Sequence, residues 1–287
     1  MLTRRSFLAT LGAFASAAVC RAKGVESGSV TNAVVARRRL DRVGIQLYSV
    51  RTEMQRDVPG TLARLAQIGY HDVEFAGYFG RNAAEIRQLL DANHLAAPST
   101  HMAYDPATWD QSLDFAKTVG HEFVTVPWID ESRRKTLDDW RRIADGFNTA
   151  AERARGRGLR FAYHNHDFEF KPVEGMVPLD VLLERTDPSL VSFEMDVYWV
   201  TFAGADPKAY LDRYPTRFAM LHIKDSAGGL KKEQTDVGSG TIDFASILRL
   251  GFDSKHAVKH VFVEHDQPPD PMAFAKNSFD YLSKLEF

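Results

Sequence analysis

The hydrophobic pattern after residue 43 alternates two kinds of segment. Short runs rich in β-branched and aromatic residues have the length and composition of buried strands, and the longer segments between them place apolar residues at helical spacing. The helical spacing is clearest in TLARLAQIG, AAEIRQLLDANH and DDWRRIADGFNTAAERARGRG. The strand-like runs are VGIQLYS, HDVEFAG, AAPSTHM, EFVTVPW, LRFAYHNH, LVSFEMDV, FAMLHIKD and HVFVEHD. The pattern therefore predicts eight successive strand and helix units.

Eight such units predict a parallel (β/α)8 barrel, or TIM barrel, as a single domain over residues 43–287. Gly69, Gly120 and Gly158 follow helical segments, where glycine commonly ends a helix. The alternative is a doubly wound open sheet, because periodicity alone does not prove that the sheet closes. LYSVRTEM follows the first strand and contains no glycine-rich phosphate or dinucleotide loop, which disfavours an open nucleotide-binding fold.

The charge balance limits the classes of partner. The chain has 287 residues and a formal net charge of −2. Binding to nucleic acid or to an anionic membrane surface needs a clustered basic surface, which leaves an excess of positive charge in the composition. We therefore expect an ordinary globular protein with no nucleic-acid partner.

The first residues resemble an export signal rather than part of the fold. TRRSFLATLGAFASAAV begins with Arg4 and Arg5 and continues as an apolar run that is too short for a stable membrane anchor. We interpret residues 1–22 as a twin-arginine signal peptide and residues 23–42 as a linker, although a hydrophobic first helix is an alternative. Cys20 is the only cysteine, and Val19 before it disfavours a lipoprotein anchor. The interpretation predicts the twin-arginine translocation machinery as a partner and a periplasmic location.

Titratable residues stand at the ends of the predicted strands. In a parallel barrel these ends form one rim, where catalytic groups gather. A carboxylate or imidazole buried there is costly unless it is paired, hydrogen-bonded or bound to metal. Any one of them alone is better explained as a loop contact, but histidine, aspartate, histidine and glutamate on four successive strands suit a divalent transition metal. The strand-end residues are Glu74, His101, His164, His166, Glu194, Asp196, His222, Lys224, Glu264 and Asp266.

Four motifs in the second half of the chain carry a resemblance to a known family. YHNH, FEMDVYW, HIKD and FVEHD, preceded by GIQLYSVR, resemble the xylose-isomerase-like barrels grouped as sugar phosphate isomerases and epimerases. In that family one metal is held by glutamate, aspartate, histidine and glutamate on strands five to eight. The resemblance implies one divalent metal ion, most often manganese, with zinc, cobalt or magnesium as alternatives. It places the ligands at His164, Asp196, His222 and Glu264.

His164 departs from the family pattern, because many members carry a glutamate at this position. In the epimerases of the family the two glutamates bind metal and also move a proton on opposite faces of a carbon atom. A metal-bound neutral imidazole has its lone pair engaged and cannot accept that proton. What remains is a metal acting as a Lewis acid together with one acid/base group, for which Glu264 is the first candidate.

Several other residues are candidates for proton transfer or substrate contact. His166 faces the same way as His164, and Lys224 lies on the same side of its strand as His222, so both are candidate catalytic groups. Flat aromatic rings at strand ends can stack on a sugar. Core packing or a loop contact is an equally good explanation for each of these residues. The expected substrate contacts are His101, Glu74, Glu169, Trp199 and Tyr48.

These observations predict an exported, metal-dependent isomerase or epimerase that transfers a proton next to a carbonyl of an unphosphorylated sugar or sugar derivative. One alternative is a lyase or hydratase that acts on 3-keto-glycosides by metal-assisted β-elimination. Another is a non-catalytic periplasmic carbohydrate-binding barrel. The three-zinc DNA-repair endonucleases share the fold but need more histidines and a basic DNA-binding face. The sequence leaves open whether the chain forms a homo-oligomer.

Overall fold

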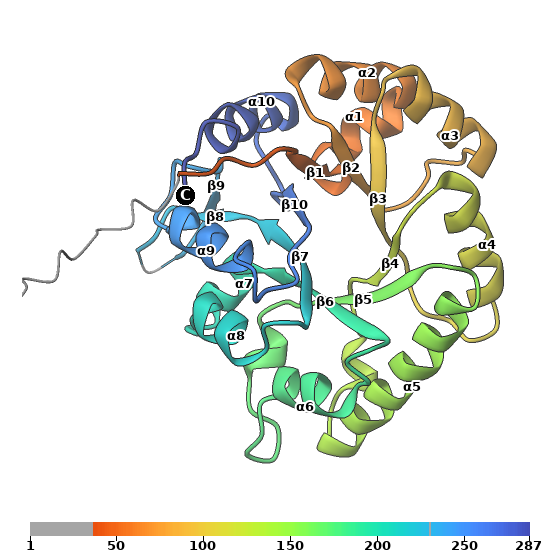
Figure 1. Cartoon of the computed structure of the whole chain (residues 1–287), viewed down its shortest axis with the longest axis vertical. Coiled ribbons are helices and arrows are strands. Elements are labelled where there is room, and N and C mark those ends of the chain that lie inside the picture. Colours follow the sequence, from red (N-terminus) through yellow and green to blue (C-terminus); the bar gives the residue numbers. More distant parts are fainter. Residues whose placement is uncertain (1–36, 230) are drawn as a thin grey trace, which may run out of the picture. The chain divides into compact units, whose positions relative to one another are not determined.

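The computed structural model describes residues 37–229 and 231–287, and the expected signal peptide lies outside these residues. Eight parallel strands form a closed barrel in the order β1-β10-β7-β6-β5-β4-β3-β2 (Figure 1). This confirms the predicted (β/α)8 barrel and excludes the doubly wound open sheet. The strands are β1 (Gly44–Gln46), β2 (Asp72–Phe75), β3 (Ala96–His101), β4 (Phe123–Val126), β5 (Arg160–His164), β6 (Val191–Asp196), β7 (Phe218–Ile223) and β10 (His260–Val263).

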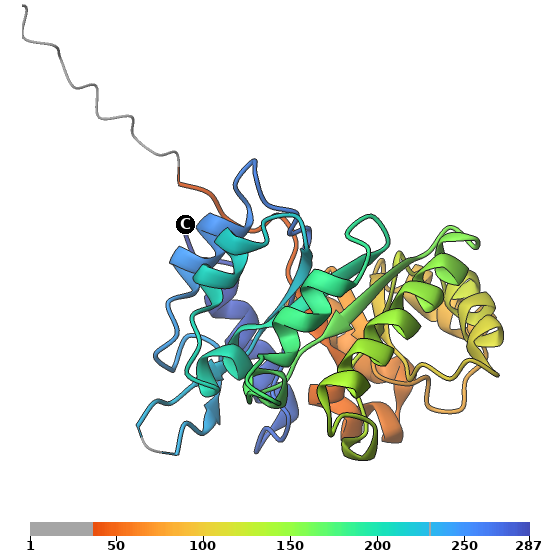
Figure 2. The ribbon, with the colours of Figure 1, turned by 90° about the horizontal axis from the view of Figure 1, so that it is seen from below.

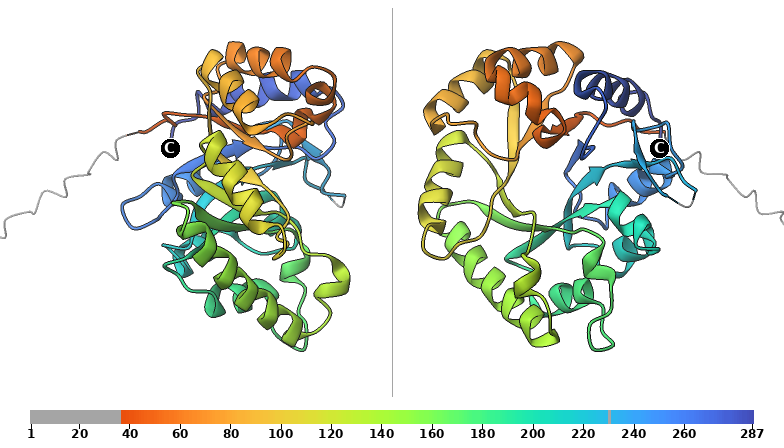
Figure 3. Two further views of the ribbon diagram at one scale, coloured as in Figure 1. Left: turned by 90° about the vertical axis from the view of Figure 1, so that its right-hand side faces the viewer. Right: turned by 180° about the vertical axis from the view of Figure 1, so that it is seen from behind.

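Helices surround the barrel on the outside, as views from its two ends show (Figures 1 and 3). Four of them, α2, α6, α8 and α10, carry a proline in the first turn, where its missing N–H costs nothing. The helices are α1 (Arg51–Arg56), α2 (Val58–Ile68), α3 (Ala83–Ala92), α4 (Trp109–Val119), α5 (Leu137–Arg155), α6 (Pro178–Arg185), α7 (Val197–Phe202), α8 (Pro207–Arg213), α9 (Phe244–Gly251) and α10 (Pro271–Leu282).

Several short elements lie in the loops that follow the strands. The 3-10 turns η1 (Leu47–Val50), η2 (Glu131–Arg133) and η3 (Phe168–Phe170) follow β1, β4 and β5. A small antiparallel hairpin of β8 (Asp225–Ser226) and β9 (Gln234–Thr235) follows β7 and projects from one end of the barrel (Figure 2, light blue). Among the described residues, no helix combines the length and apolar character needed to cross a membrane.

The first described residues contact the barrel, although residues 23–42 were expected to form a linker. Arg38 and Phe287 exchange two backbone hydrogen bonds of 2.8 and 2.9 Å, which join the two ends of the described chain. Nε of Arg42 donates to Asp72 on β2 at 2.8 Å. The last residues of the expected linker therefore belong to the packed domain.

An apolar layer inside the barrel lies beneath the polar rim. Ala162, Met220 and Phe262 are buried members of one small cluster, and each stands two residues before a titratable residue of its strand. Side chains two residues apart share one face of a strand. The polar layer above them includes His164, His222 and Glu264.

Candidate active site

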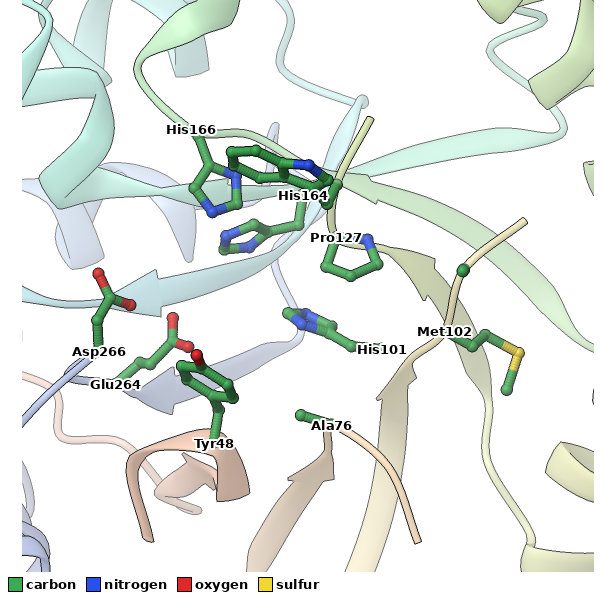
Figure 4. Close-up of a pocket in the computed structure, with 11 residues that line it drawn as sticks. Tyr48, Ala76, His101, Met102, Pro127, His164, His166, Glu264 and Asp266 are labelled. Atoms are coloured by element: carbon green, nitrogen blue, oxygen red, sulfur yellow. The ribbon is translucent and has the colours of Figure 1, made fainter. Parts of the chain in front are cut away.

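The candidate site lies at the carboxyl ends of β3, β5, β6, β7 and β10. Strand register brings its residues together, because His164 pairs with Glu194 and Asp196 pairs with His222 across neighbouring strands. Figure 4 shows His164 and His166 on one side of a cavity and Glu264, Asp266 and Tyr48 on another. The rim expected from the strand ends is therefore present.

The four expected metal ligands come together. His164, Asp196, His222 and Glu264 each offer one ligand atom, and these atoms lie within 4.8 Å of one another. All four side chains are buried. We call this group the outer ligand set.

A second group overlaps with the first. His101, His164, Glu194 and His222 also offer ligand atoms within 4.8 Å of one another. Glu194 had no expected role, although it stands two residues before Asp196 in FEMD and so shares its strand face. This spacing was the signal that could have identified it.

The two imidazole rings that belong to both groups each contact carboxylates through both nitrogens. In His164, Nδ1 lies 3.1 Å from Glu194 and Nε2 lies 3.8 Å from Asp196. In His222, Nε2 lies 2.6 Å from Oε2 of Glu74. Its Nδ1 lies 2.8 Å from Oε2 of Glu264.

This arrangement favours the outer ligand set as the metal site. A histidine that binds metal through one ring nitrogen usually donates the other N–H to a carboxylate, which fixes its tautomer. Glu194 and Glu74 can accept these N–H groups from His164 and His222, which leaves the opposite nitrogens facing Asp196 and Glu264.

The donor chemistry of the outer ligand set fits a divalent transition metal. Two imidazole nitrogens and two carboxylates suit zinc or manganese. Burial lowers the pKa of His164 to about 4, so its imidazole is neutral at neutral pH, as a ligand must be. The buried Oδ2 of Asp196 already lies 3.0 Å from one cationic group, Nζ of Lys224. The charge on this oxygen is therefore stabilised inside the site, as a carboxylate ligand requires.

Lys224 is the principal positive charge beside these ligands. Its buried Nζ lies 3.0 Å from Asp196, 2.9 Å from Glu264 and 2.9 Å from Asp266. Burial opposes its charge, but these three carboxylates together raise the pKa of Lys224 well above its usual value. Lys224 is therefore a fixed ammonium group rather than a proton acceptor.

A cavity of about 580 Å³ opens above the ligands, a size typical of small-molecule sites. Of the residues predicted from the sequence, it is lined by Tyr48, His101, His164, His166, Glu264 and Asp266. Burial, followed by the repulsion from His164 when that ring is protonated, lowers the pKa of His166 well below its usual value, so this ring is also neutral at neutral pH.

Two of the expected substrate contacts are buried and do not line the cavity. Glu74 is fully buried, where it accepts a hydrogen bond of 2.8 Å from Nε2 of Gln46 and contacts His222. Glu169 is also fully buried, and it accepts hydrogen bonds from the hydroxyl of Tyr163 and from the backbone N–H of His166. Their placement corrects the expectation of substrate contact, because Glu74 contacts the ring of His222 and Glu169 accepts the backbone N–H of His166 instead.

Trp199 and Tyr48 differ in how they approach the cavity. Trp199 lies on α7, which begins directly after β6, and its backbone N–H donates to Asp196 at 3.0 Å. Its ring lies 5.5 Å from Nζ of Lys224, but it does not line the cavity. Tyr48 lines the cavity and is 41% exposed, so only the second of these rings is placed to contact a substrate.

Known proteins resemble this chain over most of its length. An inosose dehydratase from Clostridium beijerinckii is 28% identical over 264 residues, which cover 78% of this chain and 88% of that protein. The crystal structure of a sugar phosphate isomerase/epimerase from Parabacteroides distasonis aligns with a TM-score of 0.76 and 28% identity, covering 85% of this chain and 98% of that one.

A more distant structure shares the fold. The IOLI protein, solved with a bound zinc atom, aligns with a TM-score of 0.66 and 13% identity, covering 85% of this chain and 98% of that chain. The model of the family described as xylose isomerase-like TIM barrel matches residues 62–271, which is more than half of this chain. The chain therefore belongs to the xylose isomerase-like TIM barrel family.

Proposed function

We propose that the protein is a metal-dependent lyase. It would remove a proton next to a carbonyl of an unphosphorylated, polyhydroxylated ring and expel water or an alcohol from the next carbon. One observation carries this proposal: the member of the outer ligand set that lies on β5 is His164 rather than a carboxylate. Elimination needs one group to remove a proton, whereas a symmetric epimerase needs two carboxylates. Inosose dehydratases among the relatives support the same reaction class.

The outer ligand set, His164, Asp196, His222 and Glu264, would hold the metal. A divalent ion bound there would supply Lewis-acid polarisation of the substrate carbonyl, which makes the neighbouring C–H more acidic. Lys224 holds Glu264 and Asp196 in place from behind through its Nζ contacts. The zinc atom in the IOLI structure supports a metal of this kind.

Two cavity-lining groups are available for proton transfer. His166 is neutral, and a neutral imidazole keeps a lone pair on one of its two nitrogens. Glu264 lines the same cavity from β10. We assign proton removal to one of these two side chains, and the substrate orientation decides which of them is nearer to the reacting carbon.

The same pair favours a second candidate function, the isomerisation or epimerisation predicted from the sequence. Glu264 and His166 approach the cavity from β10 and from the loop after β5, on different sides in Figure 4. Two such groups can remove a proton from one face of a carbon and return it to the other.

Deuterium exchange distinguishes these reactions. Metal-loaded protein is incubated in deuterated water with inosose, 3-keto-sugars and 3-keto-glycosides, and the products are followed by NMR. We expect loss of water or of the aglycone, because Glu264 is the one carboxylate of the outer ligand set that lines the cavity. Deuterium in an intact, isomerised sugar would instead establish the second candidate. A protein that binds these compounds with no exchange or elimination would be a carbohydrate-binding barrel.

We further propose that the protein acts in the periplasm after export by the twin-arginine route. Arg4 and Arg5 support this, together with the apolar run that follows them. Replacing both residues with lysine should leave the protein in the cytoplasm, because the paired arginines identify such signals. Fractionation with activity measurement checks this, with Arg21→Lys as the matched control. Normal export of the double variant would contradict the proposal.

A further inference from the structure

A second cavity adjoins the active-site cavity. Its volume is about 600 Å³, and it shares Ala103, Pro127 and Trp128 with the first cavity. Each cavity alone falls in the range of roughly 300–1,000 Å³ that is typical of small-molecule sites. The shared residues place the two cavities side by side, so a ligand that reaches across the exposed Trp128 would contact both.

Trp128 forms the exposed part of this shared wall. It is 52% exposed, although tryptophan usually buries most of its surface. His166 and Phe168 pack against its ring at near right angles, with ring centroids 4.9 Å away in both cases. The guanidinium of Arg134 lies over the ring, 5.4 Å from its centroid. The exposed part of this indole, held by three neighbours, is a surface on which an apolar face of a ring can stack.

The remaining lining of the second cavity suits a neutral ring that carries hydroxyl groups. Asp130 and Asp139 supply acceptors, Arg133 and Arg142 supply donors, and these four charges cancel. A balanced set of donors and acceptors matches sugar hydroxyls. An anionic ring would need an excess of arginine instead, so a second sugar residue is the better fit.

Gly146 lies on the wall of this cavity within α5. Glycine in a helix interior is less favourable than alanine by about 1 kcal/mol. A Cβ atom at Gly146 would meet only Tyr104, at 3.7 Å, so the absence of a side chain here keeps space open between Tyr104 and the helix.

A third cavity, of about 450 Å³, also adjoins the active site, through Ala76, His101 and Met102. Its aromatic side chains are less available for a ligand. The rings of Tyr78 and Phe115 pack on each other at 4.3 Å, and the Tyr78 hydroxyl lies 3.0 Å from both Thr100 and His121. The third cavity therefore lacks an exposed ring for stacking.

We propose that the substrate is a two-ring glycoside, whose reacting ring lies above the outer ligand set and whose second sugar ring lies in the cavity beyond Trp128. The identity of the reacting ring rests on the proposed function. The second cavity adds the size and class of the substrate, which is a disaccharide or larger glycoside rather than a free monosaccharide or cyclitol.

Binding to metal-loaded protein tests this without any turnover. Glucose is compared by calorimetry with glucose disaccharides of different linkage. We expect at least one disaccharide to bind about tenfold more tightly than glucose or better, because the second ring adds its own contacts. Equal or weaker binding of every disaccharide overturns the proposal. Since no reaction is measured, this result is independent of whether the enzyme eliminates or epimerises.

Variants locate the second ring. Gly146→Met places a side chain in the second cavity and should abolish the tenfold preference for the disaccharide while leaving glucose affinity unchanged. Gly146→Ala is the matched control, because it adds one methyl group and favours the helix. Trp128→Ala removes an exposed ring with little risk to folding and should reduce disaccharide affinity more than glucose affinity.

A bulky substitution in the third cavity completes the test. Ser112→Met should leave the preference for the disaccharide intact. If Ser112→Met abolishes that preference while Gly146→Met and Trp128→Ala preserve it, the second ring lies elsewhere and the assignment to the second cavity is wrong.

Discussion

The His222→Ala variant is expected to lose its bound metal and its activity together while the barrel stays folded. His222 belongs to both possible ligand groups, so its loss removes a ligand whichever group holds the ion. Loss of a residue that only supports a ligand typically costs 10–100-fold in metal affinity, so removal of a ligand should cost more than about 100-fold. Elemental analysis measures the metal, and circular dichroism measures the fold.

His71→Ala is the matched control, because His71 is exposed and lies outside both ligand groups. It should retain full metal content and activity. A His222→Ala protein that keeps its metal would contradict the assignment of both groups.

A pair of isosteric variants separates the two ligand groups. Glu264 belongs only to the outer ligand set, and Glu194 belongs only to the other group. We therefore expect Glu264→Gln to lose metal more severely than Glu194→Gln, which should show only the smaller loss typical of a supporting carboxylate. The reverse order would place the metal among His101, His164, Glu194 and His222.

The barrel fold and the grouping of the four expected metal ligands could be predicted from the sequence for a simple reason. Parallel strands of a barrel end at one rim, so residues at the ends of successive apolar runs become neighbours even when they are distant in the chain. The four expected ligands each stand within one residue of such an end, and the structure brings them together: His164, Asp196, His222 and Glu264.

The sequence could not predict in the same way how deeply each side chain is buried. A period of two gives the face of a strand but not the partners that cover it. Glu74 and Glu169 were expected at the cavity, yet Gln46 covers the first and Tyr163 binds the second. Both contacts depend on the three-dimensional packing of separate segments.

Helix α7 explains why Trp199 was misjudged. The predicted strand LVSFEMDV extends to Val197, but Asp196 ends β6 and accepts the backbone N–H of Trp199 as a helix cap. An aspartate at this position favours the start of a helix. The turn carries Trp199 towards Lys224 and away from the lining of the cavity.

Asp225, the last residue of HIKD, supports the site from a distance. Its buried carboxylate accepts backbone hydrogen bonds from Ser226 at 2.8 Å, from Gly238 and Gly240 at 2.9 Å each, and from Ile242 at 3.3 Å. These bonds hold both ends of the β8–β9 hairpin. A single carboxylate therefore orders the segment that follows β7.

The hairpin in turn reaches the candidate site through one side chain. Gln234 on β9 accepts the backbone N–H of Asp266 at 2.8 Å and donates to its carboxylate. Asp266 contacts Nζ of Lys224 at 2.9 Å. Displacement of the hairpin should therefore disturb the position of Lys224 beside Asp196 and Glu264.

Asp225→Ala is expected to lower the free energy of unfolding by about 3 kcal/mol or more and to reduce kcat. Each buried N–H left without an acceptor costs roughly 1–3 kcal/mol, and the carboxylate serves several. Denaturant unfolding measures the stability, and kinetics with metal analysis on the folded protein measure the site. Because Asp225 belongs to neither ligand group, the variant should retain metal while its kcat falls.

Glu233→Ala provides the comparison within the same hairpin segment. Glu233 is exposed, and within residues 37–229 and 231–287 its side chain pairs only with exposed Lys231, at 3.6 Å, so its removal should change stability by less than about 0.5 kcal/mol. Asp225→Asn should resemble Asp225→Ala, because an amide cannot accept hydrogen bonds on both sides as the carboxylate does. If Asp225→Ala is as stable and active as Glu233→Ala, the hairpin does not depend on this carboxylate and the connection from HIKD to Lys224 is wrong.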